Sequence, residues 1–183
     1  MRKGVDILFW VFRRAFIFSR ILCLRFRGVD IAWTATLERG CLFYLRGGRI
    51  KIESGVIIGV GVVLDAQGGS ITIGNSSTVN AYCFVGGKGG VQIGEKVMVA
   101  PHASIHSSSH NIFDTSMPMR EQGDSLGRVI IGNDVWVGTH VAILQGVALG
   151  NGSIVGAGSV VSRDVGPYEI HAGMPNYFVS KRL

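Results

Sequence analysis

Residues 131–161 read IGNDVWVGTHVAILQGVALGNGSIVGAGSVV, and every sixth residue of this stretch is aliphatic. Glycine often stands one position after the aliphatic residue, and a small or β-branched residue stands four positions after it. A unit of six residues is too short for a helix, so we expect each unit to form one short strand and one turn. The aliphatic residues, which we expect to point inward, are Ile131, Val137, Ile143, Leu149, Val155 and Val161.

The same period of six residues occurs upstream in three groups of three units, and insertions of three, two and twenty residues interrupt it. We expect three units to close one triangular coil, and successive coils to stack at about 4.8 Å. Internal repeats of fixed length are typical of solenoids. The sequence therefore predicts an all-β parallel β-helix whose loops leave at coil boundaries. The upstream aliphatic residues are Ile52, Ile58 and Leu64, then Ile73, Val79 and Val85, then Ile93, Val99 and Ile105.

The composition agrees with a single domain that is rich in turns. The chain has 183 residues, with 27 glycines but only 16% charged residues. That length is enough for one hydrophobic core, and glycine at this level favours many tight turns. The three cysteines, Cys23, Cys41 and Cys83, are far apart and match no metal-site spacing. We therefore expect reduced thiols in a cytoplasmic protein, and no metal.

The net charge of +6 comes entirely from the N-terminal segment, residues 1–27. This segment holds seven basic residues and one acidic residue, whereas the rest of the chain holds eleven of each. We therefore expect no nucleic-acid partner, because the body of the protein has no basic surplus. The predicted organisation is a basic amphipathic segment (1–27), a parallel β-helix (28–166) with an inserted loop (111–128), and a C-terminal tail (167–183).

The N-terminal segment is expected to form an amphipathic helix. Arg13 and Arg14 interrupt its apolar stretch and no small-residue cleavage site follows, so neither a signal peptide nor a transmembrane span fits. Such a helix can lie on an anionic membrane, here the inner face of the cytoplasmic membrane, or pack its apolar side on the domain or on another subunit. On a helical wheel one arc holds Arg2, Asp6, Arg13 and Arg20, and the opposite arc holds Leu8, Phe12, Ala15, Phe16, Leu22 and Cys23.

Three violations of the repeat mark candidate functional positions. Asn80 replaces the common glycine after Val79. His106-Ser-Ser-Ser-His110 stands immediately before the longest insertion. The insertion itself, residues 111–128, is long enough that we expect it to be functional.

Four motifs carry a resemblance to a known family. The chain resembles the hexapeptide-repeat acyltransferases, and is most similar to galactoside and maltose O-acetyltransferases and to the O-acetyltransferases of bacterial surface-polysaccharide pathways. The resemblance covers about residues 50–183. It implies a left-handed parallel β-helix, acetyl-CoA as the acyl donor, and a homotrimer with active sites shared between subunits. The motifs are Val99-Ala-Pro101 leading to His110, Ile131-Gly-Asn-Asp-Val-Trp-Val-Gly138, Ile154-Val-Gly-Ala-Gly-Ser-Val160 and Ala172-Gly-Met-Pro175.

The resemblance also implies roles for individual residues. His110 matches the catalytic histidine. Apart from the resemblance, His106 stands four positions before His110 and is a candidate neighbour that orients or tunes it. Asn80 matches an asparagine that contacts the acceptor, while Lys88 replaces an acidic acceptor contact, which indicates a different sugar. We therefore expect acetyl transfer to a sugar hydroxyl in surface-polysaccharide biosynthesis, with His110 as the general base. The positions that match coenzyme A contacts are Thr139, Ala157, Ser162 and Arg163.

Three alternatives remain open. Ile143-Leu-Gln-Gly-Val147 is similar to serine acetyltransferases, so serine or an amino-sugar nitrogen could be the acceptor. A non-catalytic coil stack could instead recruit partners to the membrane through residues 1–27. His102 and His140 occupy equivalent places in repeats one coil apart and should stack. The third alternative is a zinc-dependent carbonic anhydrase, because enzymes of this class share the fold and bind zinc through three histidines. The spacing of the histidines in this chain differs from theirs.

Overall fold

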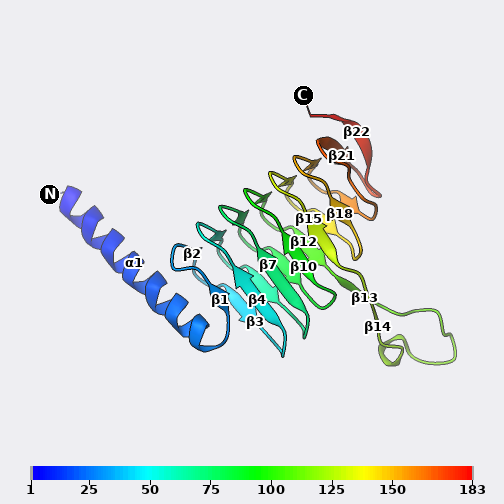
Figure 1. The fold of residues 1–183 in the computed structure, drawn as a ribbon, viewed down its shortest axis with the longest axis horizontal. Helices are drawn as coiled ribbons and strands as arrows, with labels where there is room; N and C mark the ends of the chain where they lie inside the picture. The colour runs from blue at the N-terminus through cyan, green and yellow to red at the C-terminus, as the bar shows by residue number, and fades with distance from the viewer. Residues whose placement is uncertain (1, 183) are drawn as a thin grey trace.

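The computed structural model describes the backbone of residues 2–182 and the side chains of residues 14–182. It shows one long helix followed by a stack of coils whose strands form three parallel sheets (Figure 1). This is the all-β parallel β-helix that the six-residue period predicted, and it is consistent with the left-handed form.

The three sheets are built from short strands, and every full coil contributes one strand to each sheet. The first sheet contains β1 (Asp30–Ile31), β4 (Arg49–Ile52), β7 (Ser70–Ile73), β10 (Val91–Ile93), β15 (Val129–Ile131) and β18 (Ala148–Leu149). The second contains β2 (Thr36–Leu37), β5 (Ile57–Ile58), β8 (Thr78–Val79), β11 (Met98–Val99), β16 (Trp136–Val137), β19 (Ile154–Val155), β21 (Glu169–Ala172) and β22 (Tyr177–Lys181). The third contains β3 (Leu42–Tyr44), β6 (Val63–Asp65), β9 (Phe84–Gly86), β12 (Ser104–His106), β17 (Ala142–Ile143) and β20 (Val160–Val161).

Strand pairing in the first sheet confirms the three predicted insertions. Ile52 pairs with Ile73, Ile73 with Ile93, and Ile93 with Ile131. Relative to a coil of 18 residues, these intervals are longer by three, two and twenty residues. All four side chains remain buried in the core. The extra residues therefore leave the stack at the coil boundary without moving the inward-facing positions.

A further coil precedes the repeats that the sequence revealed, and α1 (Arg2–Phe26) covers its open end. This first coil buries Ile31, Leu37 and Phe43. Ile21 and Leu24 of α1 are buried in the same core. Within the described part of the chain, no helix has an apolar stretch long enough to span a bilayer.

The C-terminal segment ends the stack. Strand β21 runs parallel to β19 and extends the second sheet by one strand. Strand β22 then turns back antiparallel to β21, and its side chains are exposed. Residues 169–181 thus take part in the sheet.

The longest insertion leaves the stack as a protruding loop whose base is an antiparallel hairpin (Figure 1). Its strands are β13 (Ser108–His110) and β14 (Asp124–Leu126), and the short helix η1 (Met119–Glu121) lies near its tip. His110 pairs with Asp124 in the hairpin register. The hairpin therefore fixes the position of the loop residues next to His110.

The close stacking of the coils predicts that position 59 tolerates no side chain larger than that of glycine. A Cβ atom at Gly59 would lie 2.6 Å from the backbone nitrogen of Ala81 in the next coil. Gly59→Ala must push two coils apart, so we expect it to lower the free energy of unfolding by about 2–3 kcal/mol. Gly123→Ala is the control, because Gly123 has a positive φ of 75° but open space around it, which costs about 1 kcal/mol. Urea unfolding measures both, and an equal loss in the two variants would contradict this account of the stacking.

Candidate functional site

An open pocket of about 530 Å³ lies where strands β6, β9 and β12 of the third sheet end and the inserted loop begins. The three strands end at one edge because they are paired in register, and the hairpin base closes the pocket from the loop side. The residues that line it are Gln67, Phe84, Gly86, Lys88, His106, Ser108, Ser109, His110 and Asp124. The pocket thus brings together His110, His106 and Lys88, which the sequence singled out, and adds Asp124.

Asp124 is the partner of His110. The Nδ1 atom of His110 lies 2.6 Å from Oδ1 of Asp124, and Lys88 Nζ contacts Oδ2 of the same carboxylate. An ionised carboxylate can only accept hydrogen bonds, so in the neutral imidazole Nδ1 carries the proton and Nε2 keeps its lone pair. The arrangement therefore presents Nε2 of His110 as a proton acceptor.

Lys88 keeps this carboxylate ionised. Its hydrogen bond to Asp124, aided by its positive charge and by His110, holds the pKa of the Asp124 carboxyl below its usual range. Asp124 is only 19% exposed, whereas the His110 side chain is 75% exposed. The carboxylate is thus positioned by the fold, while the imidazole faces the open side of the pocket.

His106 lies at the end of β12 in the same pocket, half-buried beside the ring of Phe84 at a centroid distance of 5.3 Å. Burial lowers the pKa of its imidazole, since the charged form loses hydration there. A neutral His106 adds no positive charge beside His110 at neutral pH. The position of His106 agrees with the role of a neighbour of His110. The ion pair that Asp124 forms with a histidine in this pocket is with His110 and not with His106.

Two of the residues that match coenzyme A contacts, Ser162 and Arg163, lie at the same edge of the third sheet. They follow β20, which is two strands beyond β12. The side-chain oxygen of Asn176 accepts hydrogen bonds from both of their backbone N–H groups, at 3.0 and 3.3 Å. Asn176 is 2% exposed and holds this corner in place. Sequence reasoning did not single it out.

The other three predicted residues lie at the opposite edge of the third sheet, after strands β8, β16 and β19. The side chain of Asn80 donates to the carbonyl of Val99 at 2.9 Å. The hydroxyl of Thr139 donates to the carbonyl of Pro101 at 2.7 Å. Asn80, Thr139 and Ala157 thus share one edge, but the fold of a single chain does not bring them into the pocket of His110.

Beside these three residues runs a ladder of rings. His102 stacks on His140 at a centroid distance of 4.8 Å, which confirms the predicted stacking, and Tyr82 continues the ladder at 5.3 Å from His102. Among the residues whose side chains are described, no group of three or more His, Cys, Asp and Glu is arranged to hold a metal ion.

Asp124 is the main residue that sequence reasoning missed. It belongs to a polar run in the insertion, fourteen positions after His110. Only the antiparallel pairing of β13 with β14 makes the two neighbours. A possible signal was the length of the insertion, since a loop that leaves and re-enters one coil corner must bring its two ends together.

Comparisons with known proteins agree with the repeat and with the fold. The model of the bacterial transferase hexapeptide family (six repeats) matches residues 128–163. The chain is 31% identical over 166 residues to the putative lipopolysaccharide biosynthesis O-acetyl transferase WbbJ of Escherichia coli (strain K12), covering 83% of this chain and 85% of that protein. It is 34% identical over 111 residues to the galactoside O-acetyltransferase of the same strain, covering 60% of this chain and 53% of that enzyme.

A solved structure supplies a ligand-bound relative. The hexapeptide-repeat-containing acetyltransferase VCA0836 of Vibrio cholerae O1 biovar eltor, complexed with acetyl coenzyme A, has a TM-score of 0.64 and 25% sequence identity. The match covers 78% of this chain and 70% of that one. The chain spans only about a third and about a half of the length of two curated relatives that it matches.

Proposed function

This chain belongs to the hexapeptide-repeat acyltransferase family, and we propose that it transfers an acetyl group from acetyl-CoA to a sugar hydroxyl, with His110 as the general base. The observation that supports the proposal most is the contact between His110 and Asp124 in an open pocket at the base of the inserted loop. A histidine oriented by a carboxylate is a common arrangement for taking a proton from a hydroxyl nucleophile.

The chemistry that this pair supports is direct transfer. Nε2 of His110 takes the proton of the acceptor hydroxyl as its oxygen attacks the thioester carbonyl carbon. Backbone N–H groups at the coil corners are the available donors for the oxyanion that forms. When the carbon–sulfur bond breaks, the imidazolium of His110 returns the proton to the leaving thiolate. The products are an O-acetyl ester and free coenzyme A.

Polysaccharide or lipid-linked sugars are the acceptors that we propose. A relative that this chain covers to 85% of its length carries a name that places it in lipopolysaccharide biosynthesis. The pocket is open and polar, with hydroxyls from Ser108 and Ser109 and the ammonium of Lys88 on its wall. These groups suit a hydroxylated acceptor that enters from solvent, and Asn80 would contact the acceptor as well.

The direct test is thioester cleavage with a panel of acceptors. Purified protein is supplied with acetyl-CoA and matched sugars that offer either hydroxyl groups alone or one amino group. We expect release of coenzyme A that depends on a hydroxylated sugar. Release that requires the amino group would replace O-transfer by N-transfer, and no release with any acceptor would favour a non-catalytic role.

We further propose a homotrimer in which each active site combines residues of two subunits. Asn80, Thr139 and Ala157 lie at one edge of the third sheet, while His110 lies at the other. The His110 side chain is also 75% exposed, whereas an active site must exclude water during transfer. A neighbouring subunit that presents its Asn80 edge to the His110 pocket would answer both points.

Mixing two inactive variants tests the shared site. His110→Ala and Asn80→Ala are each expected to be nearly inactive alone. If they are refolded together in equal amounts, about a quarter of the sites would carry both intact residues, so about a quarter of the activity should return. Each variant refolded alone is the control. A monomeric mass with full activity, or no recovery in verified mixed trimers, would contradict the proposal.

The place of action belongs to the same proposal. Residues 1–27, which carry all of the net charge, are proposed to hold the enzyme at the inner face of the cytoplasmic membrane, where lipid-linked acceptors occur.

A further inference from the structure

Helix α1 uses only one of its sides to cover the first coil. In the part with described side chains, Ile21 and Leu24 are buried and Ile17 is partly buried against the core. These residues lie on one side of the helix, because they are three or four positions apart. The helix therefore packs on the domain, which is one of the two alternatives that the sequence left open. This packing covers only one side of the helix.

The other side of α1 is apolar and open. Its exposed aromatic and aliphatic side chains, together with Trp33 of the first coil, form a surface that we name the outward stripe. Phe18 stacks on Trp33 with ring centroids 4.9 Å apart, which joins the helix to the coil in one surface. Exposed apolar surface that is contiguous and bordered by charge usually marks an interaction site. The outward stripe consists of Phe18, Leu22, Phe26 and Trp33, with exposures of 54%, 40%, 85% and 47%.

Arginines line both borders of the outward stripe. Arg14 and Arg25 are eleven residues apart and Arg20 and Arg27 are seven apart, so each pair lies along one side of the helix. No acidic residue occurs between positions 14 and 27. Each pair separates the buried side of α1 from the outward stripe.

Two of these arginines are held in place by hydrogen bonds to backbone carbonyls of the first coil. Nη1 of Arg20 donates to the carbonyl of Glu38 at 2.7 Å, and Nη1 of Arg25 donates to the carbonyl of Ile31 at 2.6 Å. The cations are therefore held in place beside the apolar surface.

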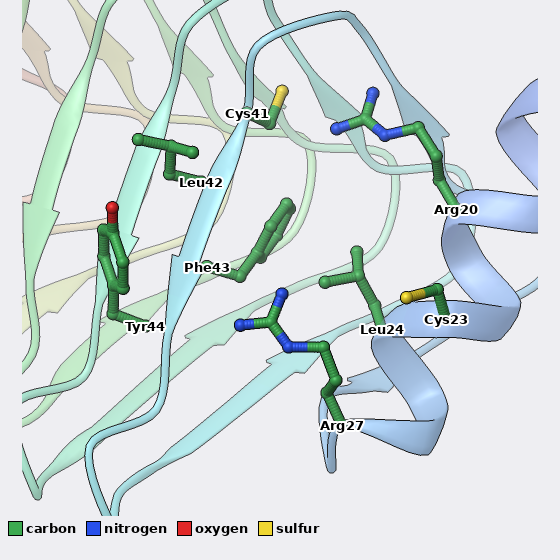
Figure 2. A pocket seen from close by; sticks show the side chains of 8 residues that line it. All are labelled: Arg20, Cys23, Leu24, Arg27, Cys41, Leu42, Phe43 and Tyr44. Carbon is green, nitrogen blue, oxygen red and sulfur yellow. The ribbon is translucent and has the colours of Figure 1, made fainter.

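A groove of about 210 Å³ between α1 and β3 lies next to this surface (Figure 2). Arg20 and Arg27 extend from the helix toward β3, and Leu24 of the helix and Phe43 of the strand lie between the two arginines (Figure 2). Cys23 lies on the helix side of the same groove. Two guanidinium groups beside apolar side chains suit the phosphate of a phospholipid whose acyl chains point away from the groove.

We propose that the outward stripe of α1 lies in the interface of an anionic phospholipid bilayer, with the helix axis parallel to the membrane and the arginine pairs at the headgroups. Both chemistries of the surface are then satisfied, since aromatic side chains enter the interface and cations meet phosphates. A second copy of the chain satisfies only one, because two outward stripes packed together would bring arginine rows face to face. The inference rests on the proposed function only for its purpose, which is to bring the enzyme to a lipid-linked acceptor.

Vesicle flotation of the full-length protein, without acetyl-CoA, tests the proposal. We expect capture by vesicles of phosphatidylcholine and phosphatidylglycerol, little capture by phosphatidylcholine alone, and weaker capture in added salt. The stripe variant Phe18→Ser/Leu22→Ser/Phe26→Ser should lose at least about tenfold in the lipid partition coefficient. A loop variant, Ile112→Ser/Phe113→Ser/Met119→Ser, removes three other exposed apolar side chains and should bind like the wild type.

Charge reversal supplies a second matched pair. Arg27→Glu should reduce partitioning by at least about fivefold, whereas Arg49→Glu, an exposed arginine of β4, should leave it unchanged. Modification of Cys23 provides an independent readout, because it is exposed while Cys41 and Cys83 are buried. Anionic vesicles should slow the reaction of Cys23 with a bulky maleimide.

Three results would overturn the proposal. These are equal capture by neutral and anionic vesicles, a stripe variant that partitions like the wild type, and a stripe variant whose oligomeric mass changes in solution. The last result would make the outward stripe a contact between subunits. None of them depends on catalysis, so they are distinguishable from a failure of the acetyl-transfer proposal.

Discussion

Replacing His110 by alanine is expected to lower turnover at least about 100-fold, because the acceptor hydroxyl loses the group that takes its proton. The side chain is largely exposed and contributes nothing to the core, so the fold should be unchanged. Acetyl-CoA binding should also persist, since the residues that match coenzyme A contacts lie elsewhere on the stack. Steady-state release of coenzyme A measures the first effect, and calorimetric titration with acetyl-CoA measures the second.

His106→Gln is the matched control for His110→Ala. His106 occupies the same pocket, but its ring contacts Phe84, and the carboxylate of Asp124 contacts the other histidine. We expect it to lose less than about tenfold in turnover. If His106→Gln proves the more damaging change, the base has been assigned to the wrong histidine.

Asp124→Asn is expected to have the second-largest effect, a loss of about 10- to 1,000-fold in kcat/KM. An amide can donate a hydrogen bond to Nδ1, which would favour the tautomer with the proton on Nε2. The imidazole would then present a proton where it must present a lone pair. Single-turnover rates at saturating acetyl-CoA would show the loss in the chemical step.

Asp114→Asn is the control for Asp124→Asn. Asp114 belongs to the same loop, and its carboxylate accepts hydrogen bonds from Ser116, outside the pocket. It should retain nearly full activity. Equal losses in the two variants would mean that loop order, and not the orientation of His110, explains the effect.

The coil stack was predictable because its cause is local and repeated. An inward aliphatic residue at every sixth position leaves a pattern that any window of the sequence shows, and the three insertions could be measured from it directly. The first coil lies within the β-helix that was predicted for residues 28–166, but its period of six residues was not recognised in the sequence. Its third inward position is Phe43 instead of an aliphatic residue, and only Ile31 and Leu37 precede it.

The candidate site was predictable only where the repeat itself carried the signal. His110 stands at the break in the period, whereas Asp124 becomes its neighbour through a hairpin whose pairing no periodicity records. Likewise, the sequence offered membrane contact and internal packing as alternatives for α1. The structure shows Ile21 and Leu24 packed on the coil while Phe18 and Phe26 stay exposed. A wheel drawn without the coil cannot tell which apolar residues the first coil will cover.

The most direct test of the central claim is transfer of label from acetyl-CoA that is labelled in its acetyl group. Full-length protein, labelled donor and a hydroxylated glycan acceptor are incubated together, and the glycan is isolated. The account predicts label on the glycan that mild alkali removes, as expected for an O-acetyl ester, and that is absent with His110→Ala. Label that resists alkali, or label that appears equally with His110→Ala, would contradict it.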